Sequence, residues 1–92
     1  MESISLVENF KLSFEKLSHT IRVIISKNDE EWVCRKEKLK KLFLFTEVDK
    51  EHLFKGRLQL LKSDGKIDIR VKNELIGTVS DEAFKEALVN LK

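Results

Sequence analysis

The sequence predicts an α+β fold, in which an antiparallel β-sheet of about four to six strands packs an N-terminal and a C-terminal helix on one face. Apolar residues follow helical spacing near both ends of the chain, and alternating β-branched segments separated by turn formers fill much of the remainder. The 92 residues include no proline and only three dispersed glycines, so no linker is evident. We therefore expect residues 1–92 to form a single domain.

The first segment, Ser5 to Ser18, fits a helix. Ser5 and Glu8 have the spacing of a capping box, in which two side chains satisfy backbone donors at a helix start. A strand is the alternative, because apolar residues alternate from Phe10 to Phe14, but Leu17 breaks this alternation. We favour the helix, whose apolar face consists of Leu6, Val7, Phe10, Phe14 and Leu17.

Residues 20–26 are rich in alternating β-branched side chains, a pattern typical of a strand. Residues 27–30 are turn formers, because Asn and Asp tolerate a left-handed backbone. A second strand through residues 32–34 closes a predicted hairpin.

Residues 35–48 are ambiguous, because the four apolar residues at 42–45 fit a short helix as well as a buried strand. We favour a helix that decays into a loop, with the lysines at 38, 40 and 41 in solvent. After it, residues 46–56 are expected to form one or two helical turns ended by Gly56.

The C-terminal third is clearer. Residues 57–62 and 66–72 are predicted strands joined by Ser63-Asp64-Gly65, and Asp-Gly between such segments is a strong hairpin signal. A further strand, Leu75 to Val79, leads to Ser80, which is expected to cap a final helix.

The chain also contains a weak internal repeat with a period of about 45 residues. Phe10-Lys11 and Phe54-Lys55 each precede a β-rich segment that ends in Lys-Asn. A duplicated β-rich unit would favour the strand alternative for residues 10–17.

No catalytic or cofactor motif is recognisable. The candidate ligands Cys34, His19 and His52 lack the spacing of a metal site, and neither glycine-rich phosphate-binding pattern occurs. A single cysteine is typical of a reducing, intracellular compartment. No apolar run approaches the ~20 residues of a membrane span, and the N-terminus lacks the features of a signal peptide. We expect an intracellular protein that is not an enzyme, stays off the membrane and takes no cofactor, metal or small-molecule substrate.

The leading functional hypothesis is a small non-catalytic interaction module, adaptor or regulatory, that binds a protein partner or forms a homodimer. The strand that carries Leu75, Ile76 and Val79 is expected at a sheet edge, where strand addition occurs. Four apolar residues fall off the core-facing pattern and are candidates for an exposed patch: Leu12, Ile24, Leu44 and Leu61.

The alternative function is nucleic-acid binding. The net charge of +2 names no partner, but residues 32–45 carry five basic residues and one acidic residue. Such a cluster fits phosphate contacts, although a solvated helix face explains it more simply. Trp32 is the candidate stacking platform, and the candidate phosphate contacts are Arg35, Lys36, Lys38, Lys40, Lys41, Arg57, Arg70 and Lys72.

Overall fold

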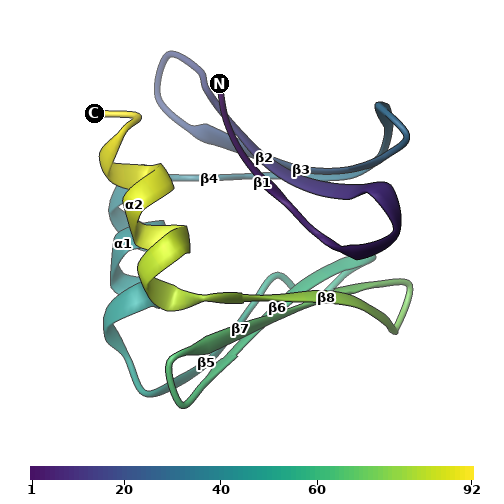
Figure 1. Ribbon diagram of the computed structural model, residues 1–92. Coiled ribbons are helices and arrows are strands. Elements are labelled where there is room, and N and C mark those ends of the chain that lie inside the picture. Colours follow the sequence, from purple (N-terminus) through teal and green to yellow (C-terminus); the bar gives the residue numbers. More distant parts are fainter.

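The computed structural model describes residues 1–92 and shows two antiparallel sheets that face each other, with two helices at one end (Figure 1). Each sheet has four strands in sequence order. The first comprises β1 (Glu2–Ser5), β2 (Phe10–Lys16), β3 (Ile21–Lys27) and β4 (Glu30–Glu37), with a 3-10 turn (Val7–Asn9) before β2. Helix α1 (Leu39–Glu47) follows, and then β5 (Lys50–Leu53), β6 (Leu58–Ser63), β7 (Lys66–Val71), β8 (Glu74–Ser80) and α2 (Asp81–Val89).

Tight turns join the strands of three hairpins. In the β3–β4, β6–β7 and β7–β8 connections, two central residues both have positive φ, as a type I′ turn requires. The pairs are Asn28-Asp29, Asp64-Gly65 and Lys72-Asn73. The hairpins predicted at 20–34 and 57–79 are confirmed, with boundaries shifted by at most three residues.

The two halves of the chain repeat the same order of four strands and one helix. A β-bulge interrupts the β3–β4 pairing after Ile25 and the β7–β8 pairing after Ile69, positions that lie 44 residues apart. The bulges leave Trp32 and Ile76 without a cross-strand partner, again 44 residues apart. A β-rich unit is therefore repeated in the structure, which agrees with the weak internal repeat of the sequence. Phe10 and Phe54 lie at the same 44-residue offset and both are buried, although Phe54 lies outside the strands. The two Lys-Asn pairs lie 45 residues apart, one residue out of this register.

The hydrophobic core lies between the sheets and beneath the helices. It is one cluster of 20 buried residues drawn from both halves. Phe84 of α2 is at its helical end, where its ring meets the ring edges of Phe14 at 5.0 Å and Phe45 at 5.9 Å between centroids. Such edge-to-face pairs suit aromatic quadrupoles. The core thus ties each helix to the facing strands.

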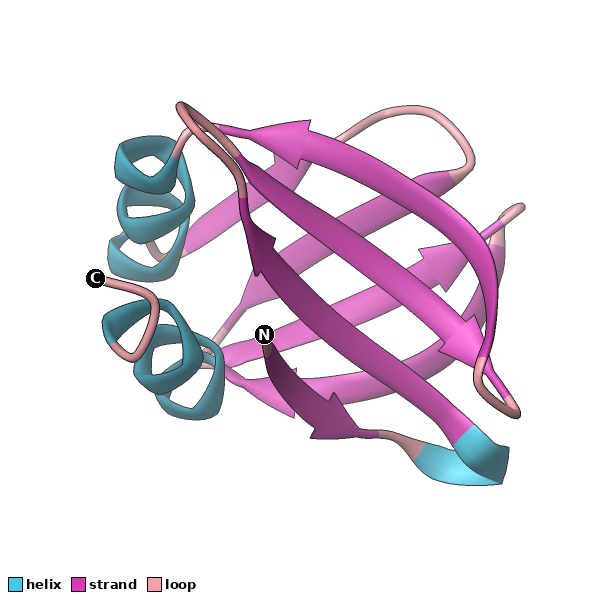
Figure 2. Ribbon diagram, turned by 90° about the horizontal axis from the view of Figure 1, so that it is seen from above, coloured by secondary structure: helices cyan, strands magenta, loops and turns pink.

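The predicted N-terminal helix is wrong. Residues 5–16 contain the end of β1, the 3-10 turn and β2, which pairs with β1 on one side and β3 on the other, and residues 17 and 18 begin the connection to β3. Glu8 has φ 55°, which a helix does not permit, so the expected capping box with Ser5 does not form. The α+β composition holds, but the two helices are α1 and α2, which pack side by side at one end (Figure 2).

The predictions for residues 35–56 are confirmed only in part. A helix is confirmed over 39–47, although residues 35–37 extend β4 instead of starting that helix. The helical turns expected within 46–56 are wrong beyond Glu47, because residues 50–53 form the edge strand β5 against β6. The expected sheet of about four to six strands is thus replaced by two sheets of four.

Candidate binding groove beside β4

Two adjoining hollows line the edge strand β4 where the first sheet meets the second. Their volumes are about 280 and 360 Å³. They share Glu31–Val33 as a common wall. Val71 and Lys72, at the end of β7, complete the first hollow; Arg57 and Leu58, at the start of β6, and Arg35 on β4 help to line the second. We call the two hollows together the β4 groove.

Trp32 stands at the centre of the β4 groove because the bulge in β4 redirects its side chain. Bulges commonly re-aim a side chain at the edge of a sheet. The indole meets the ring of Phe10 in an edge-to-face contact, with centroids 5.0 Å apart. The ammonium of Lys27 lies 5.6 Å from the indole centroid. These contacts hold the ring in place, yet Trp32 remains 47% exposed.

Three further cations surround the groove. The guanidinium of Arg35 lies 5.1 Å from the ring centroid of Phe54. Gly56 permits this approach, because a Cβ there would lie 2.9 Å from Nη1 of Arg35. The backbone N–H of Lys72 donates to the carbonyl of Arg57 at 2.8 Å, which holds these two basic residues next to each other.

The groove is electropositive because its cations have no acidic partners. The ion pairs of the chain engage Lys11, Arg22, Lys62 and Lys85, none of which lines the groove. Glu31 is the one acidic residue in the lining, and Arg22 binds it. Hydrogen bonding, chiefly to Glu15, raises the pKa of Arg22 above its usual value, so this cation stays charged beside Glu31.

Comparison of the two halves shows that the fold itself does not require this surface. At the 44-residue offset, Trp32 corresponds to Ile76 and Arg35 to Val79, and both second-half residues are buried in the core. On that side the sheets close tightly, because a Cβ on Gly77 would lie 3.3 Å from the Leu6 side chain. Apolar side chains at these positions are therefore enough to form the fold, whereas the first half of the chain has an indole and a guanidinium there.

The structure brings together only some of the predicted nucleic-acid-binding residues. All nine are exposed, but only four line the β4 groove: Trp32, Arg35, Arg57 and Lys72. Lys36 projects from the outer face of the first sheet beside Arg22. Arg70 lies on the outward-facing side of β7, and Lys38, Lys40 and Lys41 lie at the start of α1. Sequence reasoning missed Lys27, although the predicted hairpin, whose turn spans residues 27–30, already brought it close to Trp32.

The predicted protein-interface residues are separated as well. Strand β8 is at the edge of the second sheet, and Leu75 is 54% exposed. Ile76 and Val79 belong to the core. Among the four off-pattern apolar residues, Leu12 and Ile24 are buried, Leu61 is half-buried and Leu44 is exposed.

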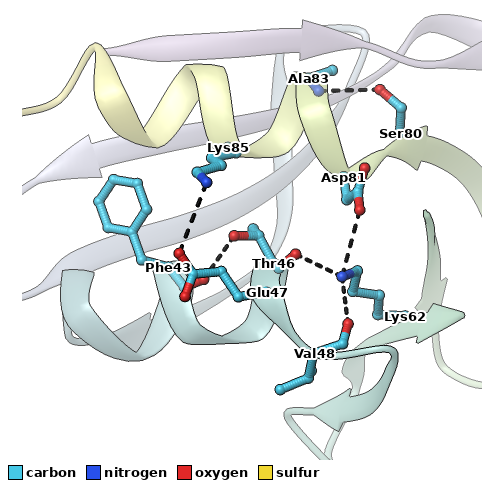
Figure 3. Close-up of polar contacts among 9 residues, drawn as sticks. All are labelled: Phe43, Thr46, Glu47, Val48, Lys62, Ser80, Asp81, Ala83 and Lys85. Carbon is cyan, nitrogen blue, oxygen red and sulfur yellow. Dashed lines mark hydrogen bonds and ion pairs between the residues drawn. The ribbon is translucent and has the colours of Figure 1, made fainter. Parts of the chain in front are cut away.

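A second polar cluster joins the ends of the two helices (Figure 3). The ammonium of Lys62, a residue only 6% exposed, donates to the carbonyls of Thr46, at 2.6 Å, and Val48. It also lies 3.4 Å from a carboxylate oxygen of Asp81 at the start of α2. The sequence signal was the inward-facing series Leu58, Leu60, Lys62 on β6. The cluster fastens α1 to α2, and neither Lys62 nor Asp81 lines the β4 groove.

No group of three or more His, Cys, Asp or Glu side chains is arranged to hold a metal ion. Neither helix has the length and apolar character needed to span a membrane. No protein-family model matches the chain, and no curated protein or solved structure matches it either.

Proposed function

We propose that this protein is a non-catalytic module that binds single-stranded nucleic acid in the β4 groove. The observation that carries the proposal is the convergence of a half-exposed indole, Trp32, with cations that lack acidic partners. Proteins that bind single strands combine these two elements, since bases stack on aromatic rings while cations follow the phosphates.

The shape of the groove favours a single strand over a duplex. Direct readout of base edges in a duplex commonly uses a helix or a β-ribbon that enters the major groove. Here Trp32 stands between two hollows at a junction of sheets, so a base must leave its stack to reach the indole. Unpaired bases meet this condition without the energy of strand separation.

The test measures binding of fluorescein-labelled oligo(dT) and oligo(U) by anisotropy over a range of salt concentrations. Trp32 is the only tryptophan, so quenching of its fluorescence reports contact with the base directly. We expect Trp32→Ala to weaken binding by about tenfold, because stacking on an aromatic side chain contributes about 1–3 kcal/mol per base. Trp32→Phe retains an aromatic face and should lose less affinity.

A matched pair of variants tests the position of the phosphate contacts. Arg57→Gln with Lys72→Gln removes two groove cations, whereas Lys16→Gln with Lys66→Gln removes two exposed cations at the far ends of β2 and β7. Lys66 is six residues from Lys72, about 20 Å along a strand. Each lost phosphate contact lowers the salt slope by about 0.7, so we expect a decrease of about 1.4 for the groove variant alone.

Two results would contradict the proposal. One is the absence of binding at low salt, and the other is equal weakening by the two double variants. Arg35 is kept in both variants, because its guanidinium covers the ring of Phe54 and its removal would also disturb packing.

Association with a protein chain is the second candidate function. The exposed Leu44, 52% accessible, favours it, because α1 buries its other large apolar side chains wholly or in part. Strand β8 is a weaker candidate surface, since Leu6 covers Gly77 and both Ile76 and Val79 face the core.

A further inference from the structure

A third hollow, distinct from the β4 groove, lies between α1 and β5. Its volume is about 370 Å³, and four of the six residues that line it are apolar: Leu44, Phe45, Val48 and Leu53. Lys41 and Glu51 are the other two. Strand β5 adjoins it as an edge of the second sheet, with its outer side unpaired. An apolar floor beside a free strand edge is typical of a surface that takes another chain.

The charged residues around this hollow are in the opposite order to the one that the dipole of α1 favours. Lysines occupy positions 38, 40 and 41 at the start of α1, and acidic residues occupy positions 47, 49 and 51 at and beyond its end. The helix dipole favours the opposite order, with acids at the start and bases at the end. Lys41 and Glu51 form no ion pair within the chain. Glu47 pairs with Lys85 within the chain, at 3.8 Å, whereas the isolated chain leaves Lys41 and Glu51 unpaired.

The same order is self-complementary when two copies meet head to tail. Around a two-fold axis, any contact of one residue with another occurs twice, with the roles exchanged. Antiparallel apposition of two α1–β5 faces brings the basic start of each helix to the acidic residues that follow the other. Lys41 of each copy then faces Glu51 of the other across the apolar floor.

We propose that the α1–β5 face binds a second copy of this chain to form a two-fold dimer. Leu44 and Leu53 provide its apolar centre, and Lys41–Glu51 contacts between copies provide its orientation. A stable interface needs about 800 Å² from each copy. That is close to one seventh of the 5789 Å² accessible surface of the chain. The proposal is independent of nucleic-acid binding, because the β4 groove shares no lining residue with this face.

Charge reversal tests the pairing directly. Sedimentation equilibrium and light scattering are measured for the unmodified chain, Lys41→Glu, Glu51→Lys and the variant with both changes. Each single reversal places like charges at two symmetric contacts, so we expect dimer dissociation to become about tenfold easier or more. The double reversal restores opposite charges at both contacts and should recover the dimer. Lys16→Glu, a reversal at an exposed site on β2, is the matched control and should leave the dimer unchanged.

Leu44→Ser supplies a second readout that does not depend on charge, and it should favour the monomer. Thermal unfolding of each variant separates loss of the dimer from loss of the fold, since Lys41, Leu44 and Glu51 are outside the buried core. A chain that stays monomeric up to about 1 mM would overturn the proposal. So would a double reversal that dissociates as readily as the single ones. No oligonucleotide is present, so these results are separate from those for the β4 groove.

Discussion

Replacement of Lys62 by methionine removes the buried ammonium while keeping an unbranched side chain of similar length. The ammonium donates to the carbonyls of Thr46 and Val48 and lies 3.4 Å from Asp81 (Figure 3). These partners are the last turn of α1, the residue after it and the first residue of α2. The substitution therefore removes one donor that serves the ends of both helices.

The loss of stability arises because the substitution leaves the carbonyls of Thr46 and Val48 without their donor. Hydrogen bonds to a charged group contribute about 1.5–3 kcal/mol each, and the two carbonyls would lose theirs together. Two effects reduce the total, because methionine gains from burial and Asp81, whose side chain is 28% exposed, can be hydrated. We expect the free energy of unfolding to fall by about 3 kcal/mol. For a domain of this size, that corresponds to a decrease in Tm of about 12–24 °C.

Urea unfolding followed by circular dichroism measures the change, with the slope m checked for constancy. Asp81→Asn is the companion variant: it removes the negative charge but leaves both carbonyl bonds of Lys62, so we expect a loss of only about 1 kcal/mol. An unfolding midpoint for Lys62→Met equal to or above that of the unmodified chain would refute the reasoning. It would mean that an apolar side chain satisfies this position as well as the ammonium does.

Two further predictions concern the helix starts. Ser80 accepts a hydrogen bond from the Ala83 N–H at 3.1 Å, so Ser80→Ala should destabilise the chain by about 1 kcal/mol. An unchanged urea midpoint would contradict this role. Lys38 begins α1 without a side-chain cap, so Lys38→Asp should stabilise by about 0.5–1 kcal/mol through capping and the helix dipole. A lower Tm for this variant would show that the lysine contributes in another way.

Elements fixed by local chemistry were predictable from the sequence. The hairpin through Asp64-Gly65 and the helix capped by Ser80 depend on turn and cap residues that act within a few positions. The strand in the N-terminal segment was not predictable in this way, because the apolar residues there fit a helical period and an alternating period equally well. Pairing decides between them, since Leu12 and Phe14 lie opposite Ile25 and Val23 of β3. Pairing with the next strand leaves no mark within the segment itself.

The sequence contains no pattern that would predict strand β5. Its residues Lys50–Leu53 are mostly polar, and it is a strand because β6 offers its backbone a partner. The β4 groove was predictable only as a list of candidates. Composition indicated Trp32 and eight basic residues, but the contact between sheets selects Arg35, Arg57 and Lys72 from that list.

The strand order described above also has a consequence for how the chain folds. Every strand pairs only with its neighbours in sequence, so each sheet can assemble from hairpins that form within about 1–10 μs. Each four-stranded meander, however, leaves one apolar face uncovered until the other arrives, because both contribute to the same core. The slow event is then the docking of residues 1–47 on residues 50–92, the contacts of greatest sequence separation. Before docking, residues 1–47 and residues 50–92 are two separate units, and both become stable when they dock.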